Sequence, residues 1–191
     1  MDERSDFIEM LIEDHSEAEN MFSTIEHLNG QPRTPEKLDE LRERTNTLIL
    51  KLVEHSVAEE ERLYPMVRER LVNGDEIADM EIAEHALAEE TMKQLDGLSP
   101  SNLDYAKTVR TLAGQIREHV GTEEARLLPA LGGELSQEER LRLGAQLEQA
   151  KSMAPTHPHP SAPDRPPANK LLGPGVAIVD RVRDLLAGRR G

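Results

Sequence analysis

Apolar residues recur at alternating intervals of three and four positions along most of the chain, which predicts amphipathic helices. Turn residues such as Asn29-Gly30, Asn73-Gly74 and Gly132-Gly133 divide this pattern into segments. In the second and fourth segments the stripe reaches Met66 and Ala130, so we expect both residues in the core. Long helices with short connections predict an all-α fold, an antiparallel up-down-up-down four-helix bundle. The four segments are residues 5–28, 35–72, 75–97 and 100–131, within a bundle domain of residues 1–133.

The chain beyond residue 133 predicts extra C-terminal helices and a linker. Ser136 and Glu139 have the spacing of a capping box, so we expect an additional helix within residues 134–153. Six prolines lie from Ala154 to Pro167, and this density predicts an extended linker over residues 154–170. The spacing of Val, Ile and Leu in residues 171–191 predicts a C-terminal amphipathic helix.

One phrase occurs twice, near the end of each half of the predicted bundle. It reads H-x-x-x-E-E-x-x-L-x-P and begins at His55 and at His119. Residues four apart share a helix face, about 6 Å apart along the axis, so the His and the first Glu can address one point. Pro65 removes an N–H and should kink its helix or loosen the bond to the carbonyl of Glu61. The repeat implies a pseudo-two-fold axis through the bundle core.

Histidine interrupts the apolar stripe of all four predicted helices. A single His in such a stripe is more often a core residue than a ligand. Here, however, two of the four are followed one turn later by a Glu, and no Lys or Arg lies on the same faces. Buried carboxylates without a counter-charge are costly, and metal cations are the simplest source of that charge. The predicted metal ligands are His15, His55, Glu59, His85, His119 and Glu123.

Composition restricts the kind of metal site. The chain has no cysteine, which excludes disulfides, zinc–thiolate sites and iron–sulfur clusters. His and carboxylate ligands suit iron or manganese. The Glu-x-x-His pattern of ferritin-type centres is absent, because an apolar residue stands three positions before each core His, and the zinc-protease motif H-E-x-x-H is absent too.

The net charge of −14 argues against a nucleic-acid partner, because phosphate binding requires a basic surface. No apolar run approaches the roughly 20 residues of a membrane span, which disfavours a membrane partner. The N-terminal residues are acidic and do not resemble a signal peptide. These features predict a cytoplasmic protein.

The order H … H-x-x-x-E … H … H-x-x-x-E on four helices resembles the hemerythrin-like, or HHE cation-binding, family. The resemblance covers residues 5–131, and the Pro-rich tail is similar to tails on actinobacterial members. It implies two non-haem iron ions with an oxo or hydroxo bridge in a four-helix bundle. It further implies that Glu59 and Glu123 bridge the irons and that the four histidines are terminal ligands.

Two positions depart from the oxygen-carrying members. Those have a second His one turn after the third helix's His, where this chain has Glu89. Their last carboxylate is an Asp five residues after the final His, whereas Glu123 follows His119 by four. One iron therefore either gains Glu89 or keeps a site for water, which disfavours simple reversible O2 carriage. Glu19 is the counterpart of Glu89 in the repeat, and either can be a ligand, a hydrogen-bond partner of a ligand or a partly solvated residue.

We expect a redox protein that reacts with O2 or hydrogen peroxide, because the resemblance implies relatives that decompose peroxide. The alternatives are a sensor or binding module that responds to iron, O2 or NO without turnover, and a metal-free structural bundle. A Tyr near the irons would donate a hydrogen bond to a bound peroxide or hydroxide; Tyr64 and Tyr105 are the two in the chain, and core packing is their simpler role. We interpret His27 as a residue near a helix end. We interpret His157 and His159 as residues of the linker.

Overall fold

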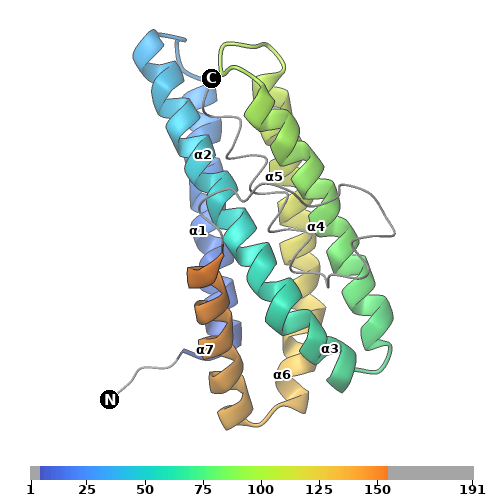
Figure 1. The fold of residues 1–191 in the computed structure, drawn as a ribbon. Coiled ribbons are helices and arrows are strands. Elements are labelled where there is room, and N and C mark those ends of the chain that lie inside the picture. The colour runs from blue at the N-terminus through green and yellow to red at the C-terminus, as the bar shows by residue number, and fades with distance from the viewer. Residues whose placement is uncertain (1–4, 155–191) are drawn as a thin grey trace.

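The computed structural model describes residues 5–154, and over this range the predicted all-helical bundle is confirmed. The linker and last helix predicted from residue 155 onward lie outside the described residues. Four long helices run alternately up and down and pack side by side, as Figure 1 shows. They are α1 (Phe7–Asn29), α2 (Pro35–Ala58), α4 (Gly74–Gly97) and α5 (Tyr105–Thr122).

Both copies of the repeated phrase contain a π-helical turn, which was not predicted. α2 passes through η1 (Glu59–Leu63) into α3 (Tyr64–Arg70), and α5 passes through η2 (Glu123–Leu127) into α6 (Leu128–Glu134). In each turn the N–H of the residue before the Pro donates to the carbonyl of the phrase's first Glu, five residues back. The Pro that follows lacks an N–H, so the ladder adopts the wider turn.

The π turns change which residues are buried beyond them. A π turn adds one residue to the helix, so the apolar stripe advances by one position. Val67 and Leu131 are therefore fully buried, whereas Ala130 is exposed and Met66 is only half-buried. The prediction that Ala130 lies in the core was wrong, because it assumed an uninterrupted α-helical period.

Two apolar cores fill the bundle, one toward each end. The first lies among α1, α2, α4 and α5 around Phe22, Leu48 and Leu112. The second surrounds Tyr64 and Leu131 and includes residues of the additional helix that follows the bundle. The stretch between these two cores contains the predicted metal ligands, so apolar packing encloses the polar centre on both sides.

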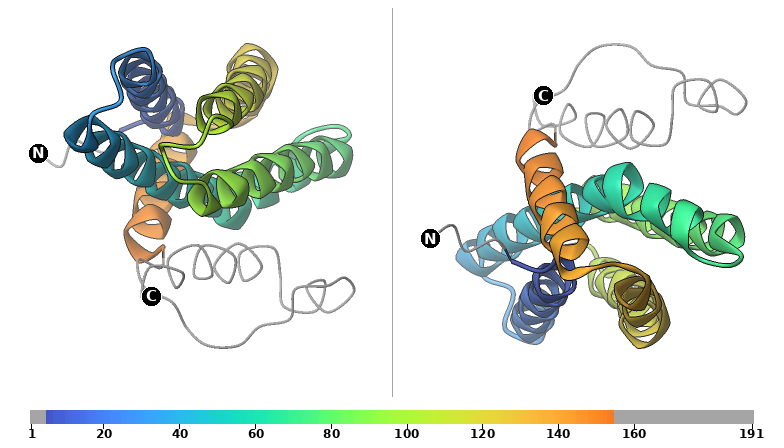
Figure 2. Two further views of the ribbon diagram at one scale, coloured as in Figure 1. Left: turned by 90° about the horizontal axis from the view of Figure 1, so that it is seen from above. Right: turned by 90° about the horizontal axis from the view of Figure 1, so that it is seen from below.

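The additional helix predicted after the bundle is present as α7 (Gln137–Met153). Its capping box is formed as predicted, with Ser136 accepting from the N–H of Glu139 and Glu139 accepting from the N–H of Ser136. α7 packs against α1, α2 and η1 at one end of the bundle (Figure 2). Gly144 allows this approach, because a Cβ there would lie 2.3 Å from the carbonyl oxygen of Ser5.

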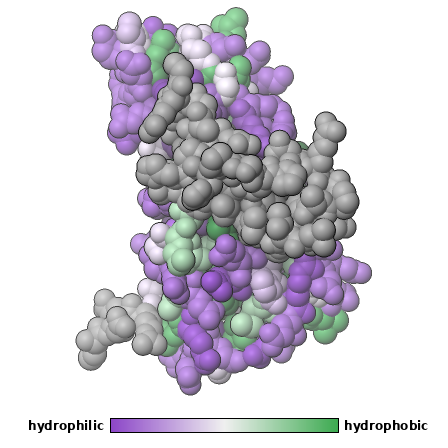
Figure 3. Space-filling view, in the orientation of Figure 1, coloured by the Kyte–Doolittle hydropathy of each residue, from purple (hydrophilic) through white to green (hydrophobic). Residues whose placement is uncertain are grey.

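On the face drawn in Figure 3, the described residues that can be seen are mainly hydrophilic. This distribution is expected for amphipathic helices that turn their apolar stripes inward. Within residues 5–154 no helix is long and apolar enough to cross a membrane.

Candidate metal centre

The four predicted histidines meet at one level of the bundle, as two pairs of rings. The rings of His15 and His55 have centroids 5.0 Å apart, and those of His85 and His119 are 4.8 Å apart. Each half of the chain thus supplies one pair, which agrees with the pseudo-two-fold axis inferred from the repeat.

The ligand atoms form two groups that share Glu59. Within each group the nitrogen and oxygen atoms lie within 4.8 Å of one another. We call them the first and second metal positions. The first position consists of His15, His55, Glu59 and Glu123, and the second consists of Glu59, His85 and His119.

The two glutamates lie between the histidine pairs. Oε1 of Glu59 is 3.1 Å from Nε2 of His55, and Oε2 is 3.3 Å from Nε2 of His85. Oε2 of Glu123 is 3.3 Å from Nε2 of His15 and 3.9 Å from Nε2 of His119. Glu59 therefore contacts one His from each half, the placement needed to bridge two ions, whereas Glu123 lies closer to His15 than to His119.

The converging atoms are buried and lack hydrogen-bond partners. Glu59 and Glu123 are both 0% exposed. Among the described residues, both of their carboxylate oxygens and the Nε2 atoms of His15 and His55 make no hydrogen bond. Buried polar atoms without partners are costly. Their lone pairs point into one space, so the residues present fit a pair of cations.

The buried carboxylates also shift the pKa values of the side chains in this cluster. Burial alone would lower the pKa of His55, but the carboxylate of Glu59 and the hydrogen bond to Asp14 raise it to about 10. Burial, followed by repulsion from Glu59, raises the pKa of Glu123. A cation that binds at this cluster would therefore compete with protons.

The outward ring nitrogen of each His contacts a further carboxylate. With Nδ1 as the donor, each imidazole keeps its Nε2 lone pair directed inward, which fixes the ligand tautomer and the ring orientation. Two contacts join residues within one half and two cross between halves. They are His55–Asp14 (3.2 Å), His119–Glu84 (3.0 Å), His85–Glu60 (3.2 Å) and His15–Glu124 (2.8 Å).

These four outer carboxylates were not among the predicted site residues, although the sequence carries a signal for them. Asp14 and Glu84 directly precede the solitary histidines, and Glu60 and Glu124 are the second Glu of each repeated phrase. A neighbouring residue points about 100° away from the stripe, so helical periodicity gave no reason to include them. They reach a His on another helix, which one-helix periodicity does not reveal. Glu81 is a further buried carboxylate at the centre, with Oε2 3.0 Å from Nδ1 of His119.

Tyr64 reaches the second metal position. Its hydroxyl is 3.2 Å from Nε2 of His85, and the residue is 1% exposed. Burial, then the charges of Glu59 and Glu123, raises the pKa of Tyr64 well above its usual value, so the phenol keeps its proton. Tyr105 instead lies in the other apolar core, beneath the guanidinium of Arg42.

The two glutamates whose role the sequence left open lie outside both metal positions. Glu89 is buried, with Oε1 3.3 Å from Nζ of Lys93 one turn later. Glu19 forms two hydrogen bonds of 2.8 Å with Arg117 at the surface. His27 contacts Gln31 at the end of α1, away from the cluster. The second position therefore groups three candidate ligands, compared with four in the first.

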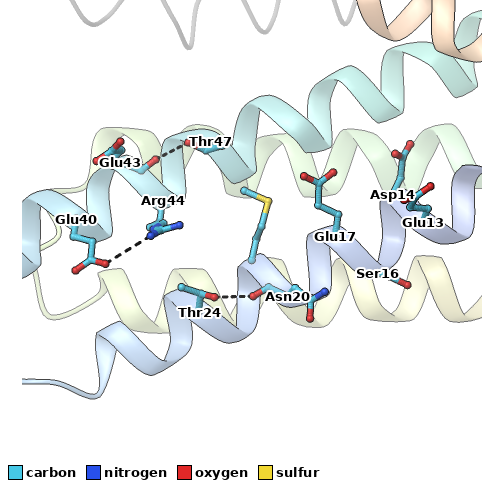
Figure 4. A pocket seen from close by; sticks show the side chains of 11 residues that line it. Glu13, Asp14, Ser16, Glu17, Asn20, Thr24, Glu40, Glu43, Arg44 and Thr47 are labelled. Carbon is cyan, nitrogen blue, oxygen red and sulfur yellow. Dashed lines mark hydrogen bonds and ion pairs between the residues drawn. The ribbon is translucent and has the colours of Figure 1, made fainter.

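A small cavity adjoins the histidines, and an open groove lies beside it. The cavity has a volume of about 30 Å³ and is lined by all four histidines together with apolar side chains such as Leu52 and Ile116. The groove, about 960 Å³, runs between α1 and α2 (Figure 4). Its charged lining is mainly acidic, and Asp14 and Glu17 line both hollows. The groove therefore presents an environment that attracts cations.

The chain was compared with known proteins. The model of the hemerythrin HHE cation-binding domain matches residues 6–131. An uncharacterised hemerythrin-like protein of Schizosaccharomyces pombe is 28% identical over 177 residues, which are 92% of this chain and 84% of that protein. A DNA nickase of Nostoc sp. is 30% identical over 141 residues; these are 73% of this chain but only 37% of the nickase, so the chain spans little more than a third of that relative. No solved structure matches the chain. With the domain model covering most of the chain and the His and Glu cluster in place, the chain belongs to the hemerythrin HHE cation-binding family.

Proposed function

We propose that this protein binds two iron ions, one at each metal position, and that the centre reacts with hydrogen peroxide or O2. The observation that carries this proposal is the placement of Glu59, whose two oxygens face histidines from opposite halves. A carboxylate shared in this way supports two ions close together, as in two-metal enzymes, where the ions lie roughly 3.5–4 Å apart. His and carboxylate ligands suit iron, with manganese as the other metal of matching preference.

The cavity beside the histidines supports a very small substrate. Its volume of about 30 Å³ is enough for one or two water-sized groups. Hydrogen peroxide, O2 and NO are of that size, whereas an organic substrate is not.

Peroxide disproportionation is the reaction that we favour. Two molecules of H2O2 give one O2 and two H2O: one peroxide loses two electrons and two protons, and the other gains both. A pair of irons supplies the matching two-electron capacity. The protein's own contribution is to hold a proton on the Tyr64 hydroxyl beside the second position, where only three protein ligands leave room for a substrate.

We do not propose DNA binding for this chain, although it is similar to part of a DNA nickase. Binding to a phosphate backbone requires a basic surface, and the chain carries a net charge of −14.

The test is oxygen evolution from hydrogen peroxide by protein loaded with iron, with iron content measured on the same sample. We expect about two irons per chain and metal-dependent O2 release that His119→Ala abolishes. Iron uptake without O2 release would exclude peroxide disproportionation, and a failure to retain iron would exclude the centre itself.

A further inference from the structure

One lysine outside the region matched by the family model contacts the surroundings of the metal centre. Lys151 lies on α7, whereas the family model ends at residue 131. Its Nζ is 2.7 Å and 2.8 Å from the two oxygens of Asp14. The two side chains are only 17% and 16% exposed, so water screens this pair weakly.

Asp14 connects this lysine to a metal ligand. Its Oδ2 accepts a hydrogen bond of 3.2 Å from Nδ1 of His55, whose Nε2 faces the first metal position. Lys151, Asp14 and His55 therefore form a continuous chain from α7 to the centre.

The second half of the repeat lacks this lysine. Glu84, the counterpart of Asp14, contacts Nδ1 of His119 at 3.0 Å, and Glu81 contacts the same nitrogen at 3.0 Å. Within residues 5–154 no Lys or Arg pairs with Glu84. The two halves thus share the outer carboxylate but differ in whether a buried cation neutralises it.

We propose that Lys151 is a positioning residue that makes the two metal positions electronically unequal, by acting through Asp14 on His55. A carboxylate that accepts the Nδ1 proton makes an imidazole a stronger donor to metal. Lys151 draws charge from Asp14 and so limits this effect at His55, while Glu84 acts on His119 without that restraint. The metal at the first position is therefore more easily reduced than it would be without the lysine. This inference rests on the proposed two-metal site.

Lys51 offers a matched control. It lies on α2, lines the same small cavity as Lys151, and is 3.8 Å from Glu17. Glu17 contacts none of the four histidines in the described part of the chain, so Lys51→Met removes the same charge nearby without breaking a chain to a ligand.

The first experiment is a redox titration of the iron-loaded full chain followed by its optical spectrum. Lys151→Met should shift the Fe(III)/Fe(II) ratio of one of the two irons toward Fe(III) by about tenfold at a fixed ambient potential, the low end of outer-shell effects. Lys151→Arg should restore the wild-type ratio, and Lys51→Met should leave it nearly unchanged. In an Asp14→Asn background, Lys151→Met should have no further effect. Equal shifts in Lys151→Met and Lys51→Met, or a full shift that persists in the Asp14→Asn background, would overturn the inference.

A second experiment separates this inference from the proposed function. In metal-free protein, the imidazole ¹⁵N and ¹H signals report the Nδ1–H of His55 directly. Lys151→Met should shift that signal and leave the Nδ1–H of His119 unchanged, with Lys51→Met as the control. If wild-type protein retains no iron, the proposed function fails and this measurement alone decides whether Lys151 acts on His55. An unchanged His55 signal would overturn the inference whether or not iron binds.

Discussion

The two halves of the bundle, α1 to α3 and α4 to α6, share one arrangement of candidate metal ligands and differ in several of the residues around it. Both place a solitary His after an acidic residue, then a second His followed one turn later by a Glu that opens a π turn. They differ at Tyr64, whose counterpart is Leu128; at Glu60, which is buried where Glu124 is partly exposed; and at the lysine on Asp14. The residues that both halves share would bind the metal. We therefore expect the residues that differ between the halves to determine reactivity.

The comparison also separates the two bridging glutamates. Glu59 belongs to both metal positions, whereas Glu123 belongs only to the first. The first position groups more candidate ligands, and the counterpart of Tyr64 in the repeated phrase is the apolar residue Leu128. We interpret the first as the more firmly held metal and the second as the side open to substrate.

The largest expected effect is loss of metal in Glu59→Gln. The amide has one poor ligand and one donor group in place of two carboxylate oxygens, so both positions lose a shared ligand. We expect the iron content of purified protein to fall from two to near zero. Glu123→Gln should mainly weaken one iron, and Glu61→Gln, an exposed neighbour, should change nothing. Retention of both irons in Glu59→Gln would refute its bridging role.

The next largest effect is expected from Tyr64→Phe. This change keeps the packing but removes the proton beside the second position, so peroxide turnover should fall about a hundredfold, the low end for general acid catalysis. Iron content should remain at the wild-type level. Tyr105→Phe, in the other core, is the matched control. Equal turnover in both variants would show that Tyr64 only packs.

A smaller effect should distinguish Glu60 from Glu124. Glu60 is 4% exposed, while the side chain of Glu124 is 38% exposed. Because a buried hydrogen bond is harder for water to replace, Glu60→Gln should weaken iron binding about tenfold and Glu124→Gln by less. Chelator competition measures both values. A larger loss in Glu124→Gln would contradict this assignment of the two carboxylates.

The smallest effect is the pH dependence of the metal-free protein. Burial would lower the pKa of His85, but the adjacent carboxylates of Glu59 and Glu60 raise it to about 9, and that of His55 rises to about 10. Both values exceed the unfolded value of about 6.5, so their stabilising effect is complete below pH 6.5 and is lost as pH rises through 9 to 10. The thermal midpoint should therefore fall over that range, and less so in His55→Gln. A midpoint that rises with pH would contradict the assigned charges.

The sequence singled out the six candidate ligands because all six lie on apolar stripes, where periodicity makes a polar residue conspicuous. It did not settle Glu89, since its ion pair with Lys93 depends on side-chain geometry. The outer carboxylates and Lys151 lie off the stripe of their own helix and act across helix contacts, which one-helix reasoning does not describe. Ala130 was misplaced because the α-helical period was continued through Glu123–Leu127, where the structure has a π turn.

The most direct test of the central claim is anomalous diffraction at the iron edge from crystals of the iron-loaded protein. The account predicts two peaks with Glu59 between them, one beside His15 and His55 and the other beside His85 and His119. A single peak, or peaks outside this cluster, would contradict it.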